Sequence, residues 1–166
     1  MIVRAQSPVA WRGEAPSPAR DDEVGAIAAL NNRFAPDGLT LPRTDAFVTA
    51  HLADYRVVRI PGGRVIGCVC LDEYSPSLAE LVSLAVEPEE QARGLGWQLI
   101  AAAVDLARRR GFPELFAVSF SDALFQRAGF ARTNVERFPE KKQRYDRISA
   151  DEWTIGQKHC FAIPLR

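Results

Sequence analysis

Apolar residues follow two spacings along this chain, one typical of helices and one typical of strands. Three acidic residues at 21–23 precede apolar residues spaced three and four apart within 24–30. Acidic residues before such a spacing mark a helix start, and we expect this helix to end near Phe34. The strongest helical pattern covers Gly94–Arg110. Its apolar stripe consists of Leu95, Leu99, Ala102 and Leu106, which recur at the period of a helix.

Two shorter helices are also predicted. Thr44 or Asp45 can cap the first of them, because side-chain oxygens at this position accept hydrogen bonds from free helix amides. Asp122–Ala128 forms the second and is ended by Gly129. The apolar residues of the first short helix are Phe47, Val48 and Leu52.

Runs rich in β-branched and aromatic residues predict the strands. Tyr55–Ile60 and Arg64–Leu71 flank the turn at 61–63, so they are expected to form a hairpin. Ala79–Val86 forms the next strand and stops before Pro88. Two later strands are expected at Leu115–Phe120 and Phe161–Leu165.

The first 20 residues form a partly irregular segment. Pro8, Pro16 and Pro18 leave room for at most a short strand around Val9–Trp11. Beyond this segment the order of elements is mixed, with early hairpin strands and then alternating strands and helices. This order predicts a mixed α/β (α+β) architecture, with one sheet covered by helices on both faces. We expect residues 1–166 to form a single domain.

Composition and charge exclude several classes of protein. Lys plus Arg and Asp plus Glu each number 21, whereas a nucleic-acid binder would carry a basic excess. The arginines at 108–110 are therefore expected to complement the dipole of their helix. No apolar run approaches the roughly 20 residues of a membrane span, and no secretory signal is evident. We expect a cytoplasmic protein that binds neither nucleic acid nor membrane.

The three cysteines do not indicate a disulfide framework or a metal site. Cys68 and Cys70 alternate within one predicted strand, so their side chains share a face and are expected in the core. Cys160 is remote from them in sequence. His51 and His159 are also remote, and we expect no bound metal.

The segment Leu84–Gly96 carries the clearest chemical signal. A strand ends, a short loop follows, and Gly94 and Gly96 open a long helix. The first amides of a helix lack partners and favour anions, so a phosphate or pyrophosphate is the expected guest. A P-loop is excluded because Trp97 follows Gly96, and a dinucleotide fingerprint because Leu99 is not small. A third interpretation is the pyrophosphate loop of acetyl-CoA-dependent transferases.

The sequence Gln91-Ala92-Arg93-Gly94-Leu95-Gly96 resembles the Q/R-x-x-G-x-G/A signature of the GNAT superfamily of acetyltransferases. The preceding Leu84-Ala85-Val86 with Pro88, and the later Phe125–Phe130, extend this resemblance. It implies the GNAT fold, with a mostly antiparallel mixed sheet of about six or seven strands, and acetyl-CoA as co-substrate. It further implies that the strand at 84–86 splays from its neighbour to admit the pantetheine arm. The cofactor-binding residues it implies are Leu84, Ala85, Val86, Gln91, Ala92, Arg93, Gly94, Leu95, Gly96, Trp97 and Phe125.

A narrower resemblance links the chain to the transferase domain of N-acetylglutamate synthases, in their short single-domain form. It is carried by Phe34–Thr44, Val65–Cys68, Tyr74–Pro76 and Ala79–Val86. It implies acetylation of the α-amine of L-glutamate, the first step toward arginine.

Glutamate carries two carboxylates, which call for cations in the site. The resemblance implies Arg43 as the residue that grips a carboxylate, Lys158 as a second cation and Ser83 as a further substrate contact. It implies Glu80 as the general base. Ser119 is implied as the general acid, since Phe125 stands where many family members have a tyrosine.

Two alternatives stay open. The chain could acetylate another amino acid, a small amine or a protein terminus. It could also be a non-catalytic acyl-CoA-binding module. Phe125 is compatible with this alternative, because it replaces the tyrosine that many family members use as the general acid. A homodimer is compatible with the sequence, which carries no signal for the oligomeric state.

Overall fold

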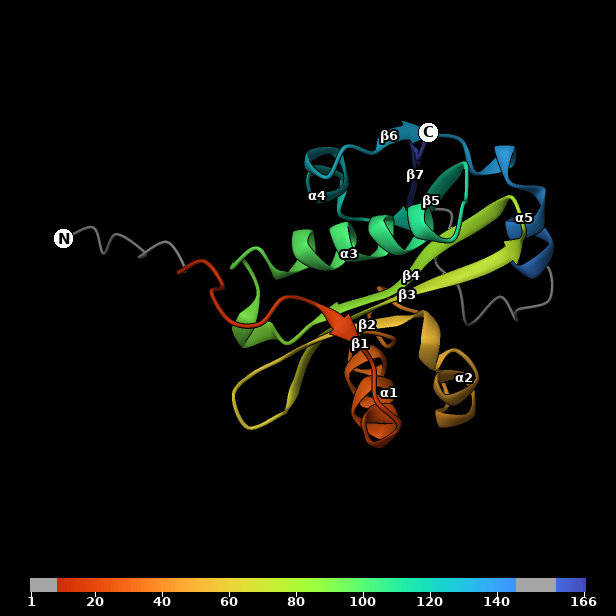
Figure 1. The fold of residues 1–166 in the computed structure, drawn as a ribbon. Coiled ribbons are helices and arrows are strands. Elements are labelled where there is room, and N and C mark those ends of the chain that lie inside the picture. Colours follow the sequence, from red (N-terminus) through yellow and green to blue (C-terminus); the bar gives the residue numbers. More distant parts are fainter. Residues whose placement is uncertain (1–8, 146–157) are drawn as a thin grey trace.

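The computed structural model describes residues 9–145 and 158–166, and they form one sheet of seven strands in the order β1-β2-β3-β4-β5-β7-β6 (Figure 1). Every neighbouring pair is antiparallel except β4 and β5, which are parallel. The predicted mixed, mostly antiparallel sheet is therefore confirmed. The strands are β1 (Ser17–Pro18), β2 (Tyr55–Arg59), β3 (Val65–Ser75), β4 (Leu78–Val86), β5 (Glu114–Ser119), β6 (Ala131–Thr133) and β7 (His159–Pro164).

Helices cover both faces of this sheet, as expected. Figure 1 shows α1 and α2 on one side of β2–β4, and α3 and α4 on the other. The α-helices are α1 (Val24–Asn32), α2 (Asp45–Ala50), α3 (Leu95–Arg109), α4 (Asp122–Arg127) and α5 (Pro139–Tyr145). Short 3₁₀ turns lie at Asp21–Glu23, Leu52–Asp54, Pro88–Glu90 and Val135–Arg137.

Local signals predict most of these boundaries. Thr44 is the cap of α2, and its side-chain oxygen accepts a hydrogen bond from the Phe47 amide at 3.1 Å. Leu52 lies beyond α2, in the following 3₁₀ turn. The strand expected at Val9–Trp11 is wrong, because the first strand is Ser17–Pro18, which pairs with β2. Instead of a sheet partner, the Trp11 amide has the carbonyl of Arg93 as its acceptor, at 2.9 Å. The strand β6 and the helix α5 were not predicted from the sequence.

The two faces of the sheet carry separate hydrophobic clusters. On one face α3 buries Leu95, Leu99 and Leu106 against β3, β4 and β5. On the opposite face α1 packs against β3 and β4, and this second cluster contains both Cys68 and Cys70. The prediction that these two cysteines are core residues on one face is confirmed. The α3 stripe differs slightly from the prediction, because Ala102 is only half-buried.

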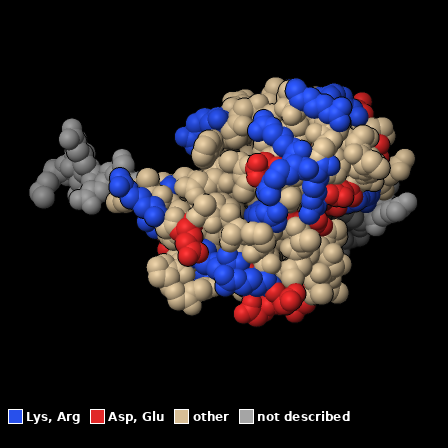
Figure 2. All heavy atoms as spheres, in the orientation of Figure 1, with Lys and Arg blue, Asp and Glu red and all other residues tan. Residues whose placement is uncertain are grey.

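The arginines at the end of α3 are matched by acidic side chains. Arg110 forms ion pairs with Asp54 at 2.6 Å and Glu73 at 2.8 Å, and Arg109 pairs with Asp105 at 2.8 Å. Figure 2 shows basic and acidic side chains interspersed over this face. Arg109 and Arg110 therefore form ion pairs with acidic residues of the same chain.

A β-bulge in β4 changes the alternation of its side chains. Cys68 faces Ala85 and Cys70 faces Val82, so two residues of β4, Ser83 and Leu84, oppose one residue of β3. Ser83 has a φ of +54°, a left-handed conformation that is unusual for a residue other than glycine. Simple alternation would set Ser83 on the face opposite Glu80. The bulge instead turns the Ser83 hydroxyl toward Tyr55, at 3.5 Å, on the α1 side of the sheet.

The strands β4 and β5 separate partway along their length. They pair only where Ala79–Leu81 meets Leu115–Ala117, although β4 continues to Val86. The expected splay of residues 84–86 is confirmed. It leaves an opening at the centre of the sheet between the two strand ends.

Candidate functional site

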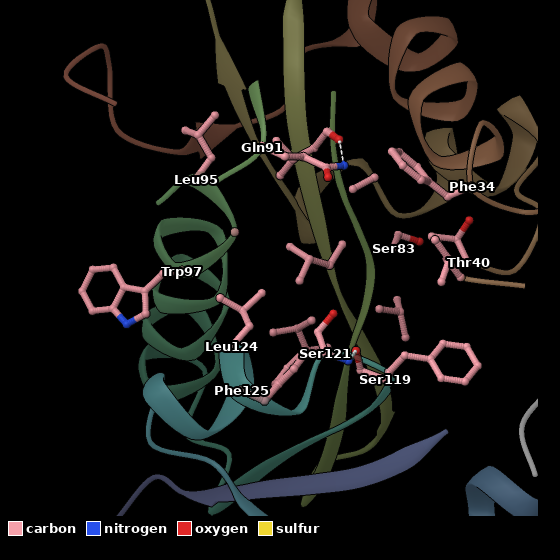
Figure 3. A pocket seen from close by; sticks show the side chains of 18 of the residues that line it. Phe34, Thr40, Ser83, Gln91, Leu95, Trp97, Ser119, Ser121, Leu124 and Phe125 are labelled. Atoms are coloured by element: carbon pink, nitrogen blue, oxygen red, sulfur yellow. Dashed lines mark hydrogen bonds between the residues drawn. The ribbon is translucent and has the colours of Figure 1, made fainter. Parts of the chain in front are cut away.

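A cavity of about 440 Å³ lies where β4 and β5 separate. The bulged half of β4, residues 81–86, lines it on one side, and the end of β5 with the residues that follow it, 118–121, lines it as well. Figure 3 shows α3 with Leu124 and Phe125 on one side of this cavity and Phe34 and Thr40 on the other. The site therefore joins segments that are up to about 90 residues apart in the chain.

The loop at 91–96 borders this cavity and leads into α3. Ala92 and Gly94 both have left-handed backbone conformations, with φ of +62° and +87°. Gln91 donates from its side chain to the Val86 carbonyl at 3.0 Å, which ties the loop to the end of β4 (Figure 3). Within the described residues, the amides of residues 92–97 have no acceptor. Free amides at a helix N-terminus form an anion-binding site.

Ten of the eleven expected cofactor-binding residues line this cavity, and Arg93 is the exception. The guanidinium of Arg93 turns outward, where its Nε donates to the Val9 carbonyl at 2.8 Å. Trp97 also lies at the rim, with 49% of its surface exposed. Arg127 lines the same part of the cavity and forms no ion pair with any described residue.

Phe125 and Ser119 both line the cavity. Phe125 is buried and stacks on Phe161, with ring centroids 5.4 Å apart. Its ring provides an apolar wall but no proton. Ser119 accepts a hydrogen bond from the Ser121 amide at 3.0 Å, which leaves the proton of its own hydroxyl available.

The predicted substrate cation Arg43 reaches the cavity through Ser83. The Nε of Arg43 is 3.4 Å from the Ser83 hydroxyl oxygen, and Ser83 lines the cavity. Its guanidinium lies over the Phe47 ring, 4.1 Å from Cζ to the ring centre. The backbone of Arg43 is held by Asn32, whose side chain bonds both its amide and its carbonyl at 2.8 Å.

The second predicted cation, Lys158, lies beside Leu39 and Phe120. Its ammonium is 3.5 Å from the Leu39 carbonyl and 5.5 Å from the centre of the Phe120 ring. Both neighbours line the cavity. Burial lowers the pKa of Lys158 below its ordinary value of 10.5, and Lys141 adds to this effect while Glu80 opposes it.

The predicted base Glu80 is buried beside the cavity rather than in its wall. Only 2% of its surface is exposed. The Lys141 ammonium is 2.8 Å from its carboxylate, and the Tyr74 hydroxyl donates to it at 2.5 Å. Burial raises the pKa of Tyr74, and the charge of Glu80 raises it further, so this phenol stays a proton donor to the carboxylate.

Several residues of the site were not anticipated from the sequence. Leu39 and Phe120 are large apolar side chains that remain 49% and 40% exposed, and both flank the opening. Lys141 lies on α5, whose sequence carries no apolar helical stripe, so nothing in its surroundings indicated a buried position. The remaining unanticipated lining residues are Phe34, Thr40, Leu81, Val82, Val118, Ser121, Leu124 and Arg127.

Other kinds of site receive no support from the described residues. Among residues 9–145 and 158–166, no three His, Cys, Asp or Glu side chains converge as a metal site would require. The same part of the chain has no helix long and apolar enough to cross a bilayer. Cys68, Cys70 and Cys160 are free and buried, and burial raises the pKa of the Cys68 thiol to about 12.

Comparison with known proteins gives a consistent result. The family model described as the acetyltransferase (GNAT) family matches residues 25–130. An uncharacterized N-acetyltransferase of Chlorobaculum tepidum is 32% identical over 123 residues, which cover 74% of this chain and 79% of that protein. An amino-acid acetyltransferase of Neisseria meningitidis is 28% identical over 128 residues. These cover 76% of this chain but only 29% of that longer protein.

Solved structures extend the similarity to the fold. N-acetylglutamate synthase from Neisseria gonorrhoeae, complexed with coenzyme A and N-acetyl-glutamate, has a TM-score of 0.78 and 25% identity. The match covers 92% of this chain and 35% of that one. Rv2747 from Mycobacterium tuberculosis, solved with CoA, also has a TM-score of 0.78, at 22% identity, over 92% of this chain and 100% of that one.

Proposed function

This chain belongs to the GNAT family and is an acetyl-CoA-dependent N-acetyltransferase, and from that premise we propose that its acceptor is the α-amine of L-glutamate. The product would be N-acetylglutamate, the starting compound of arginine biosynthesis. The amino-acid acetyltransferases and the N-acetylglutamate synthase to which the chain is similar support this acceptor.

One observation carries the proposal. The cavity has an anion-binding group of free amides at residues 92–97 and two cations, Arg43 and Lys158, in contact with its other lining residues. A transferase that joins a pyrophosphate-bearing donor to a dicarboxylic acceptor needs both features, because each charged end requires an opposite charge.

The cofactor fits the amide-lined end of the site. The amides of residues 92–97 would hold the pyrophosphate, with Gly94 allowing close approach of the backbone. The pantetheine arm would follow Leu84–Val86 into the opening between β4 and β5. Acetyl-CoA supplies an activated acetyl thioester. A backbone amide near Val86 would stabilise the negative charge that develops on the thioester oxygen.

The acceptor end would bind glutamate by charge. We propose that Arg43 pairs with one carboxylate and that Ser83, 3.4 Å from its Nε, orients the guanidinium or donates to the same carboxylate. Lys158 would pair with the second carboxylate. Its lowered pKa means that this contact would weaken as the pH rises toward the pKa, where the ammonium is lost.

Two further residues would move protons. Glu80 is buried and already accepts hydrogen bonds from Lys141 and Tyr74, but a carboxylate has capacity for about four. We propose that Glu80 takes the proton of the substrate ammonium through a water. Ser119 would return a proton to the departing thiolate, since its hydroxyl proton is not engaged and Phe125 cannot supply one.

The test is a coupled assay of CoA thiol release with acetyl-CoA and a panel of amines. We expect turnover with L-glutamate to exceed that with L-glutamine, L-aspartate and L-arginine in kcat/KM. Glutamine is the sharpest comparison, because it differs from glutamate only in the charge of the side-chain end. A kcat/KM for L-glutamine or L-arginine equal to or higher than that for L-glutamate would overturn glutamate as the acceptor. It would leave the assignment as an acetyltransferase unchanged.

A further inference from the structure

The N-terminal segment Val9–Glu14 lies against the cofactor loop, outside the residues that the family model matches. Figure 1 shows this first described stretch of chain beside the loop that leads into α3. Two backbone groups of the segment bind Arg93. The Trp11 amide donates to the Arg93 carbonyl at 2.9 Å, and the Val9 carbonyl accepts from the Arg93 Nε at 2.8 Å.

Side chains strengthen this contact. The guanidinium of Arg93 lies over the Trp11 ring, 5.2 Å from Cζ to the ring centre, and also pairs with Glu90 at 2.5 Å. The Trp11 ring packs at the edge of the large hydrophobic cluster under α3. Arg93 is therefore held on both sides, by the turn at 88–90 and by the N-terminal segment.

The position of the Trp11 ring is itself fixed locally. Its indole N–H donates to the Glu14 carbonyl at 3.1 Å. A Cβ atom at Gly13 would lie only 2.3 Å from the ring, so the close approach of ring and backbone requires glycine at this position. The segment therefore makes specific contacts with the loop and with itself.

The loop that it contacts depends on an unusual backbone. Arg93 lies between Ala92 and Gly94, which both have left-handed conformations. Alanine adopts this conformation less readily than glycine because of its Cβ atom, so it persists only where neighbouring contacts enforce it. The orientation of the free amides at 92–97 depends on the same dihedrals.

We propose that Trp11, with the segment Val9–Glu14, is a positioning element that holds Arg93 and thereby aims the loop amides at the CoA pyrophosphate. Trp11 is not among the residues that line the cavity, and it acts through Arg93. This inference rests on the proposed binding of CoA at the loop, but it does not depend on glutamate as the acceptor.

The experiment measures the Kd of the full chain for CoA by calorimetry, and for pantetheine, which lacks the pyrophosphate, by competition. We expect wild type to bind CoA more tightly than pantetheine. Trp11→Ala should raise the Kd for CoA about threefold to tenfold, the range expected when an exposed cation–π contact and its packing are lost. The Kd for pantetheine should stay the same.

Two further variants complete the experiment, one that displaces the Trp11 ring and one that should have no effect. Gly13→Ala, which displaces the ring without removing it, should raise the Kd for CoA in the same direction. Arg109→Ala removes an ion pair with Asp105 at the end of α3 that is remote from the loop, so both of its Kd values should match wild type. Thermal melts establish that each variant is folded at the assay temperature.

The outcomes distinguish pyrophosphate binding at the loop from the positioning role of Trp11. Equal affinity of wild type for CoA and pantetheine would remove the loop as the pyrophosphate site, and the positioning role with it. Tighter binding of CoA by wild type, with no change in Trp11→Ala, would overturn the positioning role alone. Equal weakening of CoA and pantetheine in Trp11→Ala would show general destabilisation and would also overturn it.

Discussion

Arg43 is a cation without an acidic partner among the described residues. Its guanidinium is half-buried over Phe47 and its Nε faces Ser83. The backbone contacts to Asn32 fix where the side chain starts. A guanidinium held in this way keeps several N–H donors for a ligand, and a carboxylate is the planar acceptor that fits them.

Replacement of Arg43 by alanine should therefore act on binding of the acceptor. We expect Arg43→Ala to raise the KM for glutamate about tenfold or more, which corresponds to loss of a hydrogen-bonded charge pair worth about 1.5–3 kcal/mol. The KM for acetyl-CoA should change little. Steady-state kinetics with each substrate varied in turn measure both constants.

Arg109→Ala is the matched control, because Arg109 pairs with Asp105 on the exposed face of α3. It should leave both constants unchanged. An Arg43→Ala enzyme with an unaltered KM for glutamate would show that another group holds the carboxylate.

Among the elements, the join between the 3₁₀ turn at 21–23 and β2 depends on one buried ion pair. Glu23 and Arg59 are 7% and 6% exposed, and the Arg59 Nη2 donates to the Glu23 carboxylate at 2.9 Å. Arg59 also donates to Ser17 and to the Pro18 carbonyl. The pair thus fastens β1, the turn before α1, and β2 together.

Loss of the Glu23 charge should destabilise this join. Glu23→Gln leaves the buried guanidinium without its counter-charge, and removal of one partner of a buried pair costs about 3–5 kcal/mol. Denaturant unfolding at pH 7 measures the free energy of unfolding. Asp22→Asn, a neighbouring change at an exposed residue, should alter it by less than about 0.5 kcal/mol.

The same pair predicts a dependence on pH. Burial alone would raise the pKa of Glu23, but hydrogen bonds from Arg59 and from the Arg20 amide, with the charge of Arg59, outweigh it and lower the pKa below 4.5. The contribution to stability is therefore present above pH 4.5 and is lost as the pH falls through the lower pKa of the folded state. Glu23→Gln should not show this component of acid destabilisation.

At the scale of the whole molecule, the cavity lies where β4 and β5 separate in a sheet that is packed on both faces. The α3 cluster covers one face and the α1 cluster covers the other, while the strands pair only at Ala79–Leu81. The loop at 91–96 and the residues at 34–40 then close opposite sides of the opening. A ligand that spans these parts stabilises the folded state only.

CoA should therefore raise the melting temperature of the protein. At a concentration of 100 times its Kd, the stabilisation is about 2.7 kcal/mol, which corresponds to roughly 5–10 °C for a chain of this size. Differential scanning calorimetry with and without CoA measures the shift.

Two glycine variants form a matched pair for this measurement. Gly94 and Gly62 have φ of +87° and +98°, and a Cβ atom at either meets nothing within 4 Å. Gly94→Ala and Gly62→Ala should lower the melting temperature of the free protein comparably, through backbone strain. Only Gly94→Ala should reduce the shift caused by CoA. A full shift in Gly94→Ala would contradict the role of the loop.

The sequence by itself determined most of the helices and strands and the loop at 91–96 that opens α3. The helical spacing of 95–106, the cap at Thr44 and the glycines at 94 and 96 are signals contained within a few residues, and such signals act before any tertiary contact forms. The chemistry of the loop follows from the same local signals, because free amides are a property of any helix N-terminus.

Only the tertiary structure decided which distant residues meet. The ion pair of Glu80 with Lys141 joins residues 61 apart, and the contact of Trp11 with Arg93 joins residues 82 apart. The bulge at Ser83 depends on how β3 registers against β4. These contacts follow from sheet order and register, which are set by how the two faces pack, and no local pattern of residues encodes that packing.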